Sequence, residues 1–339
     1  MIHELKEIIN QAVINQQKGL KNVLATVVFL EGSSYRKPGV RMLISEDLSS
    51  VGAVSGGCVE KEIIHRAKSV FSDNSSKVIT YDGRYKLGCE GILYILIEPF
   101  FVATDFIIAF SEANSNRQNI KIESHFIKEN EIFGNFGSTV TFENKKQFKF
   151  SESFKCQNNS DRNVFTQILA PAFKLLIIGG EHDAVKLCQI ASNLGWEIHV
   201  ITCAKDSKQI SHFPRARSVV GAAPETIQFK DISQNCAIVI MNHSYVQDLK
   251  YVIKLSEYQP KYIGILGAPN RRERLFNELF EFVPDISDAF LENIYTPAGL
   301  HIGAQTPEEI ALSIVAEILS VIRKKEPFSL RNLNGKIPN

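Results

Sequence analysis

A cysteine that follows two glycines and opens a predicted helix is the feature of this sequence best suited to chemistry. The run Ser55-Gly56-Gly57-Cys58-Val59-Glu60 lies between a predicted strand, residues 51–54, and a predicted helix, residues 59–71. Glycine lets a ligand approach the backbone closely, and the N–H groups and dipole of a helix start favour anions. The same field stabilises a thiolate. Cys58 can therefore contact an anionic cofactor, act as a sulfur nucleophile or ligate a soft metal.

The loop that precedes this junction, residues 32–41, is the second candidate. Its hydroxyl and cationic members are Ser33, Ser34, Arg36, Lys37 and Arg41. Such groups can clamp an oxyanion. The structural alternative is a surface hairpin loop with solvated charges. Because the loop lies close in sequence to Cys58, we weigh a shared site equally with that alternative.

A second glycine-flanked cysteine lies in Gly88-Cys89-Glu90-Gly91. A Cys58–Cys89 pair can hold a soft metal or exchange sulfur, whereas the alternative is a buried thiol in a tight turn. The six cysteines lie at positions 58, 89, 156, 188, 203 and 236 and form no C-x-x-C pair. A structural zinc site is therefore not expected.

The composition is that of a soluble globular protein with room for two domains. The chain has 339 residues, of which 44% are hydrophobic and 22% charged. A net charge of +1 gives no global reason to bind nucleic acid or a membrane surface. No apolar run reaches the roughly 18 residues of a membrane span. The first residues indicate an amphipathic helix rather than a signal peptide, so the expected compartment is the cytoplasm, where thiols stay reduced.

Hydrophobic periodicity predicts an α/β protein with two different halves. Residues 1–150 mix helices with strands in an α+β pattern. Residues 151–171 are polar and irregular and are predicted to form a linker. Residues 172–326 alternate strands and helices in the order of a doubly wound, Rossmann-like domain. Residues 327–339 form a polar tail.

The turn Gly179-Gly180-Glu181-His182-Asp183-Ala184 lies where a dinucleotide fingerprint would lie. Glu181 occupies the position where a second glycine lets the backbone reach the pyrophosphate. The next strand ends at Thr202-Cys203, without the acidic residue that binds a ribose. NAD binding is therefore not expected. An NAD(P)-dependent oxidoreductase that uses this domain is the alternative function.

Two further polar residues follow predicted strands of the second domain. His243 follows residues 236–241, and Arg271 follows residues 262–266. Ligands of open α/β sheets bind at such strand ends. His243 can hydrogen-bond a ligand or transfer a proton, and Arg271 can hold a phosphate. The structural alternatives are a strand-end hydrogen bond for His243 and a solvated first helical turn for Arg271.

Several of these stretches together resemble the XdhC/CoxI family. The stretches are Ala25-Thr26-Val27-Val28, Gly32 to Met42, Ser55 to Glu60, Gly264-Ile265-Leu266-Gly267, Pro297-Ala298-Gly299-Leu300 and Ile302 to Ala311. The resemblance spans nearly the whole chain. It implies an N-terminal XdhC/CoxI-type domain followed by a Rossmann-like domain.

The resemblance implies an accessory role in the maturation of molybdenum hydroxylases such as xanthine dehydrogenase, an enzyme of purine catabolism. Such proteins transiently bind the molybdenum cofactor, an anionic molybdopterin. They support its sulfuration with a partner cysteine desulfurase and hand it to the apoenzyme. The protein is thus expected to be a cofactor-binding chaperone rather than a catalyst, and a homodimer is compatible with this role. A scaffold that docks a desulfurase to its client without a ligand of its own is a third interpretation.

The expected cofactor site carries Cys58 as the thiolate that faces the molybdenum or its sulfur. Arg36, Lys37 and Arg41 are expected to hold the oxyanionic or phosphate end. The remaining expected contacts are Ser33, Ser34, Gly56, Gly57, Cys89, His243 and Arg271.

Overall fold

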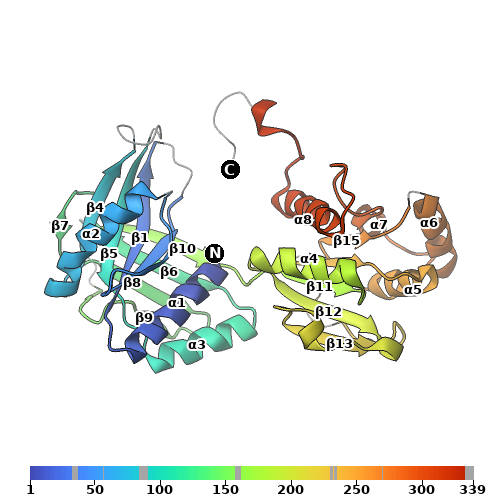
Figure 1. Cartoon of the computed structure of the whole chain (residues 1–339), viewed down its shortest axis with the longest axis horizontal. Helices are drawn as coiled ribbons and strands as arrows, with labels where there is room; N and C mark the ends of the chain where they lie inside the picture. The colour runs from blue at the N-terminus through green and yellow to red at the C-terminus, as the bar shows by residue number, and fades with distance from the viewer. Residues whose placement is uncertain are drawn as a thin grey trace. The chain divides into compact units, whose positions relative to one another are not determined.

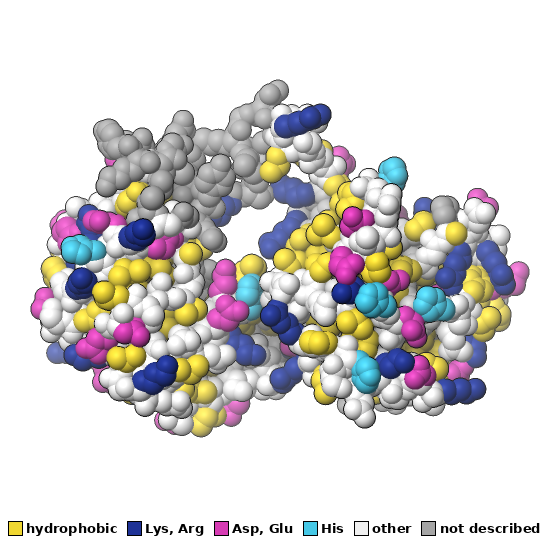
Figure 2. Space-filling view, in the orientation of Figure 1, with side chains coloured by type: hydrophobic (Ala, Val, Ile, Leu, Met, Phe, Trp, Pro, Cys, Tyr) yellow, Lys and Arg dark blue, Asp and Glu magenta, His cyan; other side chains and the backbone are white. Residues whose placement is uncertain are grey.

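Two units, Met1–Ala172 and Phe173–Asn339, make up the computed structural model (Figure 1). The structure describes residues 1–32, 37–55, 57–83, 91–156, 162–229, 232, 235–268 and 270–332, without the side chain of Cys58. Acidic and basic side chains are interspersed on the visible face of both units (Figure 2). Over the described ranges, no helix is both long and apolar enough to cross a membrane.

The first unit contains two antiparallel sheets and three helices within the described ranges. Its elements are α1 (Ile2–Gln17), β1 (Asn22–Glu31), β2 (Arg41–Ser45), β3 (Ser50–Gly52), α2 (Cys58–Asp73), β4 (Lys77–Asp82), β5 (Ile92–Pro99), α3 (Thr104–Ser115), β6 (Ile120–Phe126), β7 (Ile132–Phe133), β8 (Gly137–Phe142), β9 (Gln147–Lys149) and β10 (Asn163–Leu169). The first sheet has the strand order β3-β2-β1-β5-β4-β7, and the second has the order β10-β6-β8-β9. The predicted mixed α+β half is thereby confirmed.

The polar stretch predicted as a linker, residues 151–171, contains a strand. β10 pairs with β6 over its whole length, from Asn163 opposite Phe126 to Leu169 opposite Ile120. The side chains of Phe165, Gln167 and Leu169 turn inward, while the residues between them are exposed. The sequence does not show this alternation, because Val164 and Ile168 on the exposed face are apolar and the residues before the strand are polar. The first unit accordingly extends to Ala172.

The first sheet is covered on both faces. α2 packs on one face through Val59, Ile63 and Ala67, which form an apolar cluster with residues such as Val27 and Met42. Successive side chains of a strand point to opposite faces. The next residues along β1 and β2 therefore face the second sheet, where Leu24 and Leu43 join a cluster that includes α1 and α3.

Between the two sheets a layer of polar side chains separates two apolar clusters. One cluster contains Leu24 and Ile122, and the other contains Val28 and Phe126. The side chains between them, here called the polar layer, are Thr26, Arg41, Glu98, Ser124, Ser138 and Gln167. Each of the six comes from a different strand, so the layer joins β2, β1 and β5 of the first sheet with β10, β6 and β8 of the second.

Glu98 and Arg41 bring opposite charges into this layer. Glu98 is fully buried and accepts hydrogen bonds from the Ser138 amide (2.8 Å) and the Ser138 hydroxyl (2.6 Å). Burial raises the pKa of Glu98 to about 7, although the bonds from Ser138 and the charge of Arg41 oppose this rise. Burial also lowers the pKa of Arg41 to about 10, so Arg41 keeps its charge at neutral pH.

The second unit is a parallel, doubly wound sheet. Its elements are β11 (Lys174–Ile178), α4 (His182–Asn193), β12 (Glu197–Cys203), β13 (Ser218–Ala222), β14 (Cys236–Ile240), α5 (Tyr245–Leu255), β15 (Tyr262–Ile265), α6 (Asn270–Phe282), α7 (Asp288–Glu292), β16 (Ile294–Tyr295) and α8 (Pro307–Arg323). The strand order β13-β12-β11-β14-β15-β16, with every neighbouring pair parallel, is that of a Rossmann fold. The predicted fold class is confirmed.

Successive side chains of β11 point to opposite faces of the sheet, and each face is covered by different helices. Leu175 and Ile177 pack with α4 and α8, whereas Leu176 and Ile178 pack with α5 and α6. A strand covered on both faces is apolar at every position. α8 begins with a capping box, because the Thr306 hydroxyl accepts a bond from the Glu309 amide while the Glu309 carboxylate accepts one from the Thr306 amide.

The raised pKa of Glu98 predicts a pH-dependent stability. The folded chain keeps this proton up to about pH 7, whereas the unfolded chain releases it near its ordinary pKa of 4.5. Glu98 therefore lowers the free energy of unfolding as pH rises between these values. We expect Glu98→Gln to gain stability relative to the wild type as pH rises from about 5 to 8, measured by urea denaturation.

Glu112→Gln, at an exposed position of α3, is the control and should follow the wild type across this range. If the difference in free energy of unfolding between Glu98→Gln and the wild type stayed constant with pH, it would contradict the raised pKa of Glu98.

Candidate functional site

The predicted glycine-cysteine junction forms the start of α2. Gly57 precedes the helix with φ 117°, a left-handed conformation that favours glycine, and Cys58 is its first residue. Glu60 reaches back over the turn, where its carboxylate accepts hydrogen bonds of 2.6 Å from the amides of Ser55 and Gly57. These two amides are therefore already satisfied. The expected anion binding must use other N–H groups of the first turn.

Gly57 is exposed, and a Cβ built on it would meet no atom of the described residues within 4 Å. A ligand can therefore lie directly against the backbone here, as the sequence predicts for a glycine before Cys58.

Arg41 does not lie on the surface of the predicted loop. The sequence predicts it as an anion ligand, whereas the structure buries it in the polar layer with 8% of its surface exposed. Its Nη1 donates to the Gly39 carbonyl (2.9 Å) and to Gln167 Oε1 (2.7 Å). The physical reason is the period of the strand, because Arg41 must point away from the α2 side when Met42 points toward it.

The structure thus separates two predicted site residues by a sheet. α2, which begins with Cys58, covers one face of the first sheet, and the guanidinium of Arg41 lies against the other. Lys37, four residues before Arg41, is exposed. Ser33, Ser34, Arg36, Gly56 and Cys89 lie outside the described residues.

In the second unit the strand ends converge as a Rossmann fold requires. Gly179, the residue after β11, lies directly against the residue after β14. A Cβ on Gly179 would lie only 2.7 Å from the Met241 carbonyl oxygen. Ala184 is fully buried in the first turn of α4. These two residues fill the first and third fingerprint positions. Glu181, at the second, is the exposed N-cap residue of α4 and makes no side-chain cap bond.

Arg271 is held by a buried carboxylate at the neighbouring strand ends. Its Nη2 donates to Asp248 Oδ2 (2.6 Å), and its Nη1 donates to the Leu266 carbonyl (3.1 Å). Asn242 donates to the other oxygen of Asp248 (2.9 Å). Burial raises the pKa of Asp248, and these two partners oppose the rise. The guanidinium predicted to hold a phosphate therefore already neutralises Asp248. His243 is exposed.

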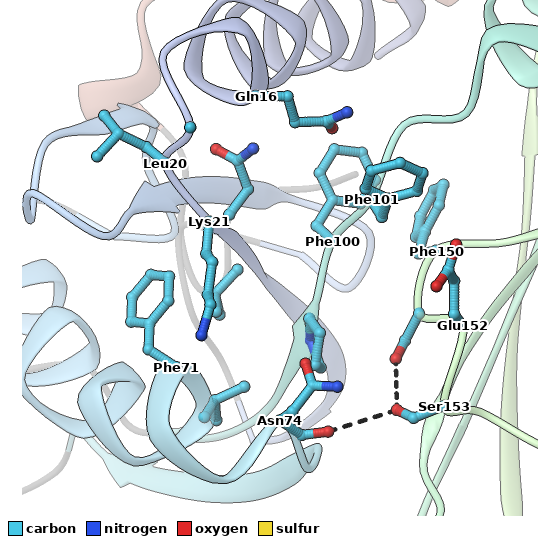
Figure 3. Close-up of a pocket in the computed structure, with 16 residues that line it drawn as sticks. Gln16, Leu20, Lys21, Phe71, Asn74, Phe100, Phe101, Phe150, Glu152 and Ser153 are labelled. Atoms are coloured by element: carbon cyan, nitrogen blue, oxygen red, sulfur yellow. Dashed lines mark hydrogen bonds between the residues drawn. The ribbon is translucent and has the colours of Figure 1, made fainter.

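A cavity of about 360 Å³ lies elsewhere in the first unit, between the ends of α1 and α2 (Figure 3). Phe100, Phe101 and Phe150 form much of its wall, with Lys21 and Glu152 among its polar members. Lys37, Arg41 and Gly57 do not line it. Among the residues that the structure describes, no three His, Cys, Asp or Glu side chains are grouped to hold a metal ion.

Sequence reasoning missed the residues that share the polar layer with Arg41. Glu98 ends the otherwise apolar run Ile92–Pro99 before its proline. A carboxylate in a strand buried on both faces is itself a signal, because such a charge needs partners. Ser138 and Gln167 carry no comparable signal, since each is an ordinary polar residue in an antiparallel strand.

Comparison with known proteins agrees with this architecture. Residues 175–318 match the XdhC Rossmann domain, and residues 16–82 match the XdhC and CoxI family. The first match covers the parallel sheet from β11 into α8, and the second covers β1 to β4 with the whole of α2.

Three relatives extend the comparison to nearly the full chain. A probable xanthine dehydrogenase subunit of Bacillus subtilis (strain 168) is 31% identical over 323 residues, which cover 89% of this chain and 93% of that protein. The "Molybdenum cofactor insertion chaperone PaoD" of Escherichia coli (strain K12) is 22% identical, covering 96% and 91%. A crystal structure of a xanthine dehydrogenase from Bacillus halodurans superposes with a TM-score of 0.74 at 26% identity, covering 94% and 96%. The chain therefore belongs to the XdhC and CoxI family.

Proposed function

We propose that this protein binds the molybdenum cofactor, supports its sulfuration and delivers it to a molybdenum hydroxylase of the xanthine dehydrogenase type. The observation that carries the proposal is its relationship over 96% of its length to a molybdenum cofactor insertion chaperone. The proposed partners are the hydroxylase apoenzyme and a cysteine desulfurase. The proposed compartment is the cytoplasm, where a thiol such as Cys58 stays reduced.

The start of α2 fits such a ligand. No atom of the described part of the chain lies where a Cβ of Gly57 would be, so a flat pterin or an oxo-metal group is proposed to approach the backbone there. Cys58, as the first residue of the helix, is proposed to place its thiol at the metal end, where the helix dipole favours a thiolate. Lys37 is proposed to attract the anionic end of the cofactor. The bound cofactor itself would supply the metal-centred chemistry.

The remaining predicted contacts are proposed to have different roles. Ser33, Ser34, Arg36, Gly56 and Cys89 stay as proposed ligands on the strength of their residue types. His243 is exposed at the end of β14 and stays a proposed contact of the second unit. Arg271 is proposed to maintain the strand ends through Asp248 rather than to bind the cofactor.

Replacing Cys58 tests the cofactor site directly. After co-expression with the cofactor pathway, we expect Cys58→Ala to retain about tenfold less cofactor than the wild type, the effect of losing one contact of about 1.4 kcal/mol. The measurement is molybdenum and pterin per mole of purified protein, together with activation of the client apoenzyme. Cys156→Ala, at an exposed position of the first unit, is the matched control and should behave as the wild type.

Unchanged retention and unchanged activation in Cys58→Ala would remove this thiol from the mechanism. A wild-type protein that purifies without pterin yet still activates its client would favour the docking scaffold. Stoichiometric binding of NAD or NADP in a titration would instead favour the oxidoreductase.

The proposed structural role of Arg271 makes a separate prediction. Arg271→Ala leaves the Asp248 carboxylate buried beside Asn242 without its cation, and we expect the free energy of unfolding to fall by about 2–4 kcal/mol. Arg272→Ala removes the neighbouring, exposed arginine and should change stability by no more than about 0.5 kcal/mol. Chemical denaturation measures both. Equal stability of the two variants would show that the Asp248 pair does not support the fold.

A further inference from the structure

Arg41 contacts the end of the predicted cofactor loop rather than its surface. Nη1 of Arg41 is shared between the Gly39 carbonyl (2.9 Å) and Gln167 Oε1 (2.7 Å). Gly39 also packs directly on Gln167, because a Cβ at Gly39 would lie 2.2 Å from Gln167 Nε2. The guanidinium therefore joins the loop to β10, a strand of the other sheet.

The same short segment is tied to the first sheet by its backbone. The Gly39 amide donates to the Val27 carbonyl (2.8 Å), and the Val27 amide donates to the Val40 carbonyl (3.1 Å). The Val40 amide in turn reaches the Lys37 carbonyl (3.4 Å), which closes a turn. Gly39 has φ 100°, a conformation that a side chain would strain. Contacts to both sheets thus fix the chain two residues after Lys37.

Arg41 is poorly placed to hold a ligand itself. With 8% of its surface exposed, it would have to leave the polar layer to reach one. Within the described part of the chain, its Nε and Nη2 are buried and make no hydrogen bond. Burial lowers the pKa of Arg41, and the nearby carboxylates of Glu98 from β5 and Glu4 from α1 oppose this shift. Such a group is costly to bury, so its place in the layer calls for an explanation.

We propose that Arg41 is a positioning residue, which together with Gln167 holds the Gly39 end of the loop so that Lys37 meets the cofactor. The role rests on the proposed function, since it assigns the loop to that ligand. This role differs from the direct anion contact expected of Arg41 from the sequence, because Arg41 would affect the cofactor only by holding the Gly39 carbonyl. An arginine suits the role because the two N–H groups of one terminal nitrogen, Nη1, serve the Gly39 carbonyl and the Gln167 side-chain oxygen together.

The test uses the full-length chain and the variant Gln167→Ala, which removes one partner of Arg41 without removing a charge. We expect amide hydrogen exchange at Gly39 and Val40 to rise about fivefold, the change expected from one lost hydrogen bond. We expect cofactor retention after co-expression to fall about threefold to tenfold. Exchange at Ile95 and Ile97, in the middle of β5, should stay at the wild-type rate.

Thr166→Ala is the matched control, because Thr166 is the neighbouring residue on the exposed face of β10. It should leave exchange and retention unchanged. Arg41→Lys is the second variant, which keeps the charge opposite Glu98 but not the planar group. It should change both readouts in the same direction as Gln167→Ala, and by at least as much.

Three results would overturn the positioning role while leaving the proposed function standing. The first is lower retention with normal exchange at Gly39, which would make Arg41 or Gln167 a direct contact. The second is faster exchange at Gly39 with normal retention, which would detach the loop from the ligand. The third is faster exchange at Ile95 and Ile97 as well, which would show a general loss of stability. A wild-type protein that retains no cofactor would overturn both proposals.

Discussion

The burial of a guanidinium and a carboxylate between two sheets is the constraint on which the first unit depends. Such charges are tolerated only where hydrogen bonds and opposite charges offset their loss of water. Glu98 meets this requirement through Ser138 and Arg41, and Arg41 meets it in part through Gly39 and Gln167. The first sheet must therefore keep its register, because a shift by one residue in β1, β2 or β5 would replace Thr26, Arg41 or Glu98 with an apolar residue. The layer fixes where the loop before β2 ends.

This constraint links the interior of the first unit to its proposed function. The apolar clusters on either side of the layer supply most of the burial, but they would accept several arrangements of the loop. The contacts of the polar layer are more selective, because hydrogen bonds have a narrow range of favourable distances and angles. α2 lies on the opposite face of the same sheet, and Glu60 fixes its first turn by binding two amides. The loop and the helix start are thus held independently, by different side chains and from different faces of one sheet.

Much of the fold could be predicted from the sequence, and the physical reasons are local. The continuous apolar strands of the second unit and the helices between them indicate a Rossmann fold, because strands buried on both faces are apolar at every position. Gly57, directly before Cys58, and Gly179 mark turns that the structure contains. The place of Arg41 could not be predicted in this way, because neighbouring cations suggest a solvated loop, whereas the period of β2 decides its direction. The contact of Glu98 with Ser138 joins residues 40 positions apart, and β10 shows no clean alternation in the sequence because Val164 and Ile168 on its exposed face are apolar. Pairings of this kind depend on the assembled sheets.

The position of β10 in the chain exposes the contact between Gln167 and Arg41 to mechanical force. Gln167 lies on the last strand of the first unit, and only residues 170–173 separate the end of that strand from the start of β11. β10 is also an edge strand, paired on one side to β6. Tension applied to the chain at the start of the second unit therefore acts on β10 before any other strand of the first unit. The strand that would yield first under such a pull is the one that carries the amide partner of Arg41.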